Sequence, residues 1–190
     1  MIAALFVEKN GAYYGLPDVD PWPLDRDART YAGPHRVVAH PPCARWCRLA
    51  GLVEARWGHK RGDDGGCFAS ALASVRRFGG VLEHPAESAA WPAFGLPRPS
   101  RNGWARDFYD GWSTEVAQRN YGHKARKLTW LYAVGVVPPR LNWRRPAAPK
   151  HQVSNLTNHG GLLEWLPKWE RAATPIAFRD VLLKIAKGAL

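Results

Sequence analysis

The chain alternates between short apolar runs and stretches rich in proline, glycine and charged residues. The runs at 2–8, 36–40 and 80–83 have the length and the aliphatic content of buried strands. The last two runs end in a polar residue and a proline, at His40-Pro41 and at Glu83-His84-Pro85. Proline fixes φ and has no N–H to donate, so each proline predicts the end of a strand.

A helix is predicted between the second and third runs. Phe68, Leu72 and Val75 recur at helical spacing, Asp64 precedes them as a candidate N-cap, and Gly79 follows as a candidate C′ residue. A strand, a helix and a strand in succession form a βαβ unit, whose strands are parallel and whose crossover is right-handed. We therefore predict an α/β, Rossmann-like fold with a mostly parallel sheet flanked by helices.

The remaining pattern predicts a short helix near 24–31, two strands at 114–118 and 128–135 with a basic loop between them, and a final helix. The final helix begins at Thr174-Pro175, with Thr as N-cap and Pro as the first helical residue. Its core-facing stripe consists of Phe178, Val181, Leu182 and Ile185. The length of 190 residues suits one domain, predicted over 1–190 with a small Pro- and Trp-rich insert at about 137–170.

Charge and cysteine content indicate the class of partner and the cellular compartment. The formal net charge is +11 and the sequence pI is about 10.0, which favours an anionic partner such as nucleic acid. Three cysteines, an odd number, argue against a disulfide scaffold. The N-terminus lacks the features of a signal peptide, and no apolar run is long enough to cross a bilayer. We therefore expect a reduced, cytoplasmic protein without a membrane partner.

Cys43 is the leading candidate nucleophile because it follows Pro41-Pro42 at the end of a predicted strand. Ligands of open α/β sheets bind beyond the carboxyl ends of strands. A zinc deaminase is disfavoured, because Cys43 and Cys47 are one residue too far apart for that signature. A structural zinc on His40 and the cysteines stays conceivable, although the spacing matches no common pattern and no metal is predicted. Phosphate-binding and dinucleotide-binding glycine motifs are absent.

An ordered set of motifs follows along the chain. Its members are Pro41-Pro42-Cys43, Glu83-His84-Pro85, Gln118…Tyr121-Gly122-His123…Lys127-Leu128-Thr129 and Thr174-Pro175-Ile176-Ala177-Phe178. In this order the chain resembles the cytosine-5 DNA methyltransferase family, in its divergent, short, phage-type form. The resemblance covers roughly residues 36–135 and 170–186. It implies a truncated methyltransferase-type fold, DNA as partner and S-adenosylmethionine as cofactor.

The resemblance also implies roles for single residues. Cys43 becomes the nucleophile that adds to C6 of cytosine, and Glu83 becomes the acid that engages the base. The implied nucleic-acid contacts are Arg45, Trp46, His84, Gln118, Arg119, His123, Lys124 and Lys127. The implied cofactor contacts are Asp20, Pro41 and Thr174, with Asp18, Asp25 and Asp27 as the other acidic candidates.

Two alternatives stay open at this level. The first strand is not followed by the glycine-rich loop that the family uses for its cofactor. In the first alternative, which this missing loop motivates, the chain is a DNA-binding or protein-inhibiting module that kept the fold and lost the cofactor. In the other alternative, the same thiol addition serves a different donor or acts on a free nucleotide.

Overall fold

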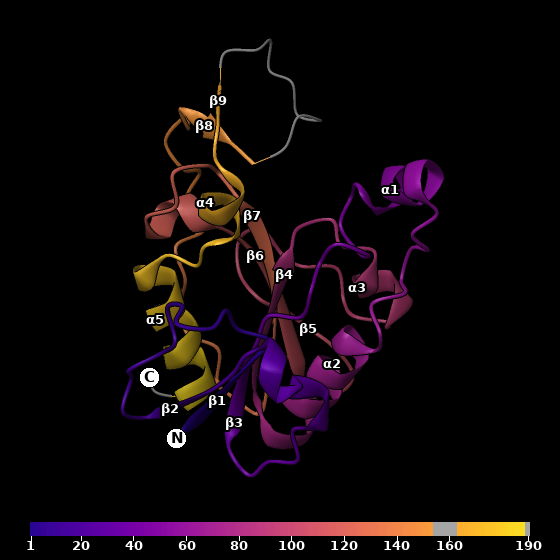
Figure 1. The fold of residues 1–190 in the computed structure, drawn as a ribbon. Coiled ribbons are helices and arrows are strands. Elements are labelled where there is room, and N and C mark those ends of the chain that lie inside the picture. Colours follow the sequence, from indigo (N-terminus) through magenta and orange to yellow (C-terminus); the bar gives the residue numbers. More distant parts are fainter. Residues whose placement is uncertain (154–162, 189–190) are drawn as a thin grey trace.

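A single seven-stranded sheet organises the protein (Figure 1). The computed structural model describes residues 1–153 and 163–188. In spatial order the strands are β2 (Val19–Trp22), β1 (Ile2–Leu5), β3 (Arg36–Ala39), β4 (Gly80–Pro85), β7 (Leu128–Val134), β6 (Gly111–Ala117) and β5 (Ala105–Arg106). β2, β1, β3 and β4 are parallel, whereas β7 is antiparallel to both of its neighbours and β5 is antiparallel to β6.

The sheet is therefore mixed, and the prediction of a mostly parallel sheet is wrong for its second half. The reason is the short connection from β6 to β7 through residues 118–127. A parallel crossover needs a dozen or more residues and usually a helix, whereas a shorter connection makes an antiparallel pair. Because β7 is antiparallel to both β4 and β6, β6 runs in the same direction as β4. The ends of β3, β4 and β6 and the start of β7 thus meet at one edge, which we call the site edge.

Helices cover both faces of the sheet. α2 connects β3 to β4 on one face, and α5 lies on the other (Figure 1). The helices are α1 (Ala50–Trp57), α2 (Cys67–Phe78), α3 (Ala90–Ala93), α4 (Lys168–Ala172) and α5 (Ile176–Lys187). The 3₁₀ turns are η1 (Leu24–Arg26), η2 (Ala28–Thr30) and η3 (Gln118–Tyr121), and β8 (His151–Gln152) and β9 (Glu164–Trp165) form a small second sheet. Among the described residues, no helix is long and apolar enough to cross a membrane.

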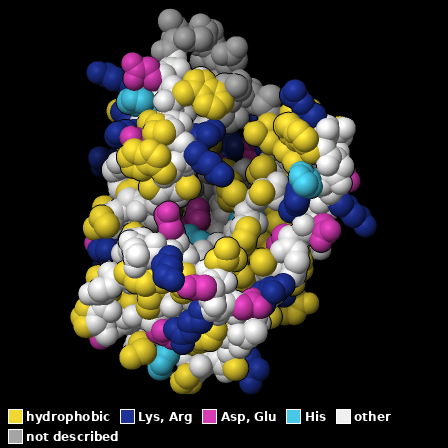
Figure 2. Space-filling model, in the orientation of Figure 1, with side chains coloured by type: hydrophobic (Ala, Val, Ile, Leu, Met, Phe, Trp, Pro, Cys, Tyr) yellow, Lys and Arg dark blue, Asp and Glu magenta, His cyan; other side chains and the backbone are white. Residues whose placement is uncertain are grey.

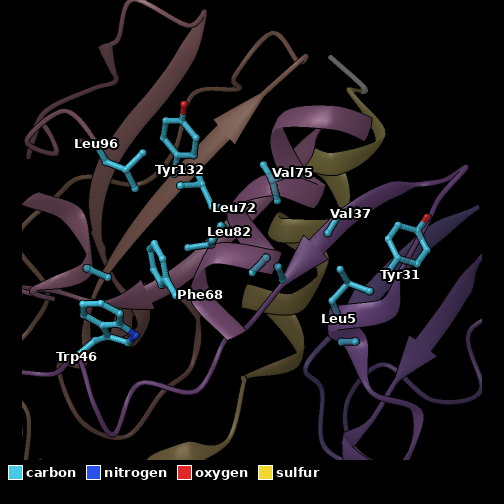
Figure 3. Packing of buried hydrophobic residues seen from close by; sticks show 14 of the residues in the cluster. Leu5, Tyr31, Val37, Trp46, Phe68, Leu72, Val75, Leu82, Leu96 and Tyr132 are labelled. Carbon is cyan, nitrogen blue, oxygen red and sulfur yellow. The ribbon is translucent and has the colours of Figure 1, made fainter. Parts of the chain in front are cut away.

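The core follows from the two-residue period of the strands. Side chains of a strand alternate between faces, so Val37 packs in the cluster under α2 and Val38 in the cluster under α5. Figure 3 shows the α2 side, where Phe68 and Leu72 lie over Leu82 of β4. These contacts fix β3 and β4 next to each other, and Gly80 permits the close approach. Its φ is +130°, and a Cβ there would stand 1.9 Å from the Val37 carbonyl oxygen.

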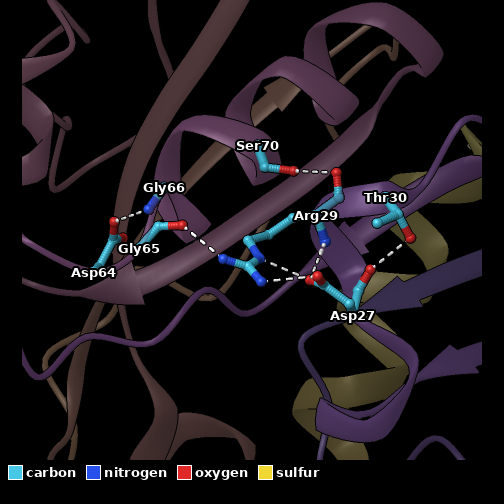
Figure 4. A network of polar contacts seen from close by, with 7 residues as sticks. All are labelled: Asp27, Arg29, Thr30, Asp64, Gly65, Gly66 and Ser70. Carbon is cyan, nitrogen blue, oxygen red and sulfur yellow. Dashed lines mark hydrogen bonds and ion pairs between the residues drawn. The ribbon is translucent and has the colours of Figure 1, made fainter.

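The start of α2 is held by a polar network (Figure 4). Asp64 accepts hydrogen bonds from the backbone N–H groups of Gly66 at 3.0 Å and Phe68 at 2.8 Å. The N-cap residue is Gly66 and not the predicted Asp64, so α2 begins two residues later than predicted. Asp64 still accepts from the N–H groups at the start of the helix, but from outside it. Arg29 pairs with Asp27 and donates to the Gly65 carbonyl, which ties η2 to this turn.

Most predicted elements are confirmed, with two corrections. β2 was not predicted, because it is a short edge strand that contains Pro21 and buries none of its side chains fully. α5 begins at Ile176, with Pro175 in the N-cap position and no side-chain cap from Thr174. The predicted insert at about 137–170 contains β8, β9 and the first part of α4, and its residues 154–162 lie outside the described residues.

Candidate active site

Five polar side chains from different elements form a continuous chain at the site edge. The Tyr13 hydroxyl contacts His40 Nε2 at 2.8 Å, and His40 Nδ1 contacts Glu83 Oε2 at 2.9 Å. Gln118 Nε2 donates to Glu83 Oε1 at 3.2 Å and to Thr129 Oγ1 at 2.8 Å. We call Tyr13, His40, Glu83, Gln118 and Thr129 the Glu83 network. It exists because β3, β4 and β6 end, and β7 begins, at the same edge.

Glu83 is held in its ionised form. Its side chain is 13% exposed, so it is mostly removed from solvent. Desolvation is the largest single influence and raises its pKa, but the hydrogen bond from His40 and the nearby Lys127 ammonium outweigh it. The pKa of Glu83 therefore lies below its ordinary value. At neutral pH this carboxylate can accept a hydrogen bond, and it has no proton of its own to donate.

Cys43 stands next to this carboxylate in the protonated form. Desolvation, followed by the neighbouring Cys47 and Glu83, raises the pKa of the Cys43 thiol to about 11. Lys127 acts in the opposite direction and lowers that pKa. Only a thiolate is a strong nucleophile, so the thiol must lose its proton as it reacts. The predicted pair of Cys43 and Glu83 lies at the same edge, because His40, three residues before Cys43, contacts Glu83 at 2.9 Å and the charge of Glu83 raises the pKa of Cys43.

Lys127 lies inside the site, whereas the resemblance implied a contact with nucleic acid. Its backbone φ is +36°, and its Nζ donates to the carbonyl oxygens of Ala172 at 3.2 Å and Ala173 at 3.0 Å. Desolvation lowers the pKa of Lys127, while Glu83 and Cys43 raise it. Lys127 thereby connects the thiol and the carboxylate to the segment that leads into α5.

Four implied nucleic-acid contacts are corrected by their burial. Trp46, His84, Gln118 and His123 are 8%, 1%, 1% and 5% exposed. The Trp46 indole donates to Asp64 at 2.7 Å and packs on Phe68.

The other three have partners inside the protein as well. His84 contacts Ser88 at 2.8 Å, and desolvation lowers its pKa to about 4, so it is a neutral core residue. His123 contacts the backbone of Ala125. Gln118 supports Glu83, as the network shows.

The other three implied contacts lie at the surface. Arg45 lines an open pocket of about 490 Å³ together with Pro42, which precedes Cys43. Arg119 and Lys124 line a second open pocket of about 470 Å³. Neither pocket is lined by Cys43 or Glu83. Figure 2 shows a hollow on this face, between the α1 segment and the α4 and β9 segment, with charged side chains of both signs in it.

The residues present do not form the cofactor site that the resemblance implies. Instead of a glycine-rich loop, β1 is followed by a connection whose Tyr13 is 3% exposed and bonded to His40. Pro41 is buried, and Thr174 lies between the carbonyl groups bound by Lys127 and the start of α5. All four acidic candidates already have basic partners. The pairs are Asp18 with Lys187, Asp20 with Arg26, Asp25 with Lys9 and Asp27 with Arg29.

The sequence analysis gave no role in the site to three members of the Glu83 network. His40 carried a usable signal, because it is a polar residue that ends a strand just before a proline, as Glu83-His84 does. Thr129 stands at the end of the third motif, but no role was assigned to it. Tyr13 carried no signal, because hydroxyl groups are common in connections. Within the described residues no group of three or more His, Cys, Asp or Glu side chains is arranged to hold a metal ion.

Together the fold and the site define an α/β protein with a thiol and an ionised carboxylate at the carboxyl ends of neighbouring parallel strands, and a lysine that precedes the adjacent antiparallel strand. Comparison with protein families, curated proteins and solved structures gives no match to this chain. The functional argument therefore rests on the chemistry of these three side chains and on the charge around them.

Proposed function

We propose that this protein is a methyltransferase-like enzyme that modifies cytosine at C5 in DNA, with Cys43 as nucleophile. The observation that carries the proposal is the pairing of Cys43 with an ionised, doubly hydrogen-bonded Glu83 at the ends of neighbouring parallel strands. A thiol beyond a strand end can reach a bound base, and a fixed acceptor beside it can orient that base. The net charge of +11 suits a DNA substrate.

The chemistry explains why these residue types belong together. C5 of cytosine is a weak nucleophile. When sulfur forms a bond to C6, the electrons of the C5–C6 double bond shift to the C4–C5 bond and the C4–N3 electrons move onto N3, so that C5 becomes the nucleophilic carbon of an enamine. The proton that the thiol loses is taken up at N3, which leaves the adduct neutral. C5 then takes up an electrophile, the simplest being a solvent proton. Loss of the original C5 proton and expulsion of sulfur restore the double bond and the thiol.

Each polar group has a role in this scheme. The Glu83 carboxylate accepts a hydrogen bond from the exocyclic amino group of cytosine, which is a donor. Lys127 favours the thiolate, because its ammonium lowers the pKa of Cys43. His40 and Gln118 hold the two carboxylate oxygens in place. A base must leave the duplex to reach such groups.

The direct test measures hydrogen exchange at C5, because this step needs no donor. A cytosine-containing oligonucleotide is incubated with the protein in D₂O, and deuterium in the recovered nucleoside is measured by mass spectrometry. We expect exchange with the wild type and with Cys47→Ser and Cys67→Ser, but none with Cys43→Ser. DNA from cells that express the wild type is expected to contain a modified cytosine that the Cys43→Ser strain lacks. Absence of any Cys43-dependent exchange or product would sink the catalytic proposal.

One observation favours a second candidate, a DNA-binding or inhibitory module without a cofactor. This observation concerns the region where the resemblance places the cofactor. There Tyr13 is buried, and the four acidic candidates form ion pairs with residues of the protein itself. This candidate predicts DNA binding that Cys43→Ser leaves unchanged, and no exchange at C5. Calorimetry with S-adenosylmethionine separates the two further, because tight binding of that molecule would exclude a module without a cofactor.

A further inference from the structure

The positive charge of the protein is concentrated in one part of the sequence. Residues 116–163 contain eight Lys and Arg and no Asp or Glu. The eight are Arg119, Lys124, Arg126, Lys127, Arg140, Arg144, Arg145 and Lys150. Two of them are already used within the fold, because Lys127 lies in the site and Lys124 pairs with Glu170 at 2.7 Å. The charge of the other six has no role in the fold or the site described so far.

Arg119 brings two pieces of this segment together. Its guanidinium donates to the carbonyl oxygens of Ala147 at 2.8 Å and Ala148 at 3.1 Å, and to that of Lys124 at 2.7 Å. An isolated β-bridge joins Ala125 to His151. Residues 124–127 therefore lie beside residues 147–151, although the two pieces are far apart in the sequence.

Four exposed basic side chains lie on these two neighbouring pieces or within three residues of them. They are Arg126, Arg144, Arg145 and Lys150, and we call them the basic ledge. Within residues 1–153 and 163–188, none of the four forms an ion pair with an acidic side chain. Exposed like charges repel one another, so a ledge of this kind is best satisfied by an external anion.

The ledge is continuous with the candidate active site. Arg126 precedes Lys127, and Arg119, which anchors the ledge, follows Gln118 of the Glu83 network. Arg119 also lines the open pocket of about 470 Å³, together with Lys124 and Ala147. In Figure 2, Lys and Arg side chains border the hollow. An anion on the ledge is therefore also a neighbour of the site.

We propose that the basic ledge binds the phosphodiester backbone of a nucleic-acid strand, so that the substrate is a polymer and not a free nucleotide. This inference rests on the proposed function for the role of the bound strand. A single nucleotide carries its phosphate at one point. By contrast, Lys150 is six residue steps along the chain from Arg144, which allows the ledge a length of up to about 20 Å. Along a strand this length covers several phosphates, since they recur about every 3.4 Å of duplex axis.

The test is a binding titration by fluorescence anisotropy. The probe is a fluorescein-labelled 20-nucleotide single-stranded DNA, and its duplex, the RNA of the same sequence and deoxycytidine monophosphate are used as competitors. The ledge variant combines Arg144→Gln, Arg145→Gln and Lys150→Gln. The matched control combines Arg77→Gln, Lys184→Gln and Lys187→Gln, which remove the same charge from the last turns of α2 and α5 at the opposite edge of the sheet.

We expect the ledge variant to bind the labelled strand at least about tenfold more weakly at low salt, with a salt slope smaller by about 2, because each lost phosphate contact on a single strand removes about 0.7. The control variant keeps its affinity within about twofold. Equal weakening in both variants would show an effect of net charge alone and overturn the proposal. So would an unchanged ledge variant, or competition by deoxycytidine monophosphate as strong as that of the oligonucleotides.

Folding and function are controlled separately. Circular dichroism establishes that each variant is folded, and Lys150→Gln alone, with an expected slope change of about 0.7, serves if the triple variant does not fold. Exchange at C5 of deoxycytidine monophosphate that is equal in the wild type and the ledge variant would overturn the ledge and leave the thiol addition by Cys43 standing. Ledge-dependent binding without exchange would support the ledge and remove the proposed function. Duplex and RNA competitors then identify which polymer the ledge prefers.

Discussion

Replacing Glu83 separates its structural role from its charge. Glu83→Ala removes the acceptor for His40 Nδ1 and one of two acceptors for the Gln118 amide. A buried donor left without a partner costs about 1–3 kcal/mol. Gln118 still has Thr129, so its loss is smaller than that of His40. We therefore expect Glu83→Ala to lower the free energy of unfolding by about 2–4 kcal/mol.

Glu83→Gln tests whether the network can adapt. The amide oxygen can still accept from Gln118, and the amide nitrogen can donate to His40 Nδ1 if the imidazole takes the other tautomer. The Tyr13 hydroxyl then accepts from His40 Nε2, which it contacts at 2.8 Å. We expect Glu83→Gln to cost less than about 1 kcal/mol at neutral pH.

The pH dependence gives the sign of the charge effect. The pKa of Glu83 is lower in the folded protein than its ordinary value of 4.5. The unfolded chain therefore takes up a proton first as pH falls. The stabilisation by ionised Glu83 is complete above pH 4.5 and is lost as pH falls through the lower folded pKa. The difference in unfolding free energy between wild type and Glu83→Gln is expected to shrink below pH 4.5.

The assay is urea denaturation of the wild type and both variants at pH 7 and at steps down to pH 3, followed by circular dichroism. Equal m-values are required, so that shifts of the midpoint report stability. The reasoning is refuted if Glu83→Ala costs under about 0.5 kcal/mol, the range of an ordinary surface substitution. It is also refuted if Glu83→Gln is as costly as Glu83→Ala, because the tautomer exchange then does not occur.

Three further predictions concern single side chains and the surroundings of each, namely Cys43, His84 and Asp64. Because the pKa of Cys43 is about 11, its alkylation by iodoacetamide, followed by peptide mass spectrometry, is expected to be slow at pH 7 and to accelerate about tenfold per pH unit toward pH 11. Lys127→Gln is expected to slow the alkylation further, because Lys127 lowers the pKa of Cys43. Rapid labelling of wild-type Cys43 at pH 7 would contradict the high thiol pKa. His84 has a folded pKa of about 4 against an ordinary 6.5, so its contribution to stability is complete above pH 6.5 and falls by about 3 kcal/mol as pH drops to 4. That slope, measured by urea midpoints, should be absent in His84→Gln. Asp64→Ala should lower stability by about 2 kcal/mol, because two helix-start N–H groups and an indole lose their acceptor. The exposed Asp63→Ala serves as control and should change thermal stability little.

The core of the fold was predictable because its signals are local. β3, α2 and β4 have apolar runs of the right length, and proline or glycine marks their ends. The direction of β7 depends instead on how β6 and β7 pair across the sheet, which periodicity does not report. The short connection 118–127 was the usable clue. β2 left no clear pattern, because Pro21 lies within it.

The candidate site was predictable for residues fixed by strand ends and not for those fixed by packing. Cys43 and Glu83 follow from the end of β3 and from β4, whose positions the sequence indicates. Trp46 and His84 lie beside the same motifs, yet their side chains turn into the core. Neighbours in sequence at a strand end point to opposite sides. Proximity to a motif therefore does not decide whether a residue meets solvent, and only the burial of each side chain separates the two groups.

The position of Glu83 next to Cys43 has a consequence for how the proposed reaction begins. Glu83 is one of the groups that raise the thiol pKa, while Lys127 lowers it. A cytosine whose amino group donates to Glu83 shields part of that negative charge, and the effect of Lys127 on the thiol then weighs more. Binding of the base thus weakens one of the three influences that raise the thiol pKa, whereas desolvation, the largest of them, stays in place. The thiol therefore remains protonated before the attack, and a protonated thiol is less prone to oxidation. On this reasoning the thiol loses its proton only as the bond to C6 forms, which is how a thiol with a high pKa serves a site proposed to work by thiol addition.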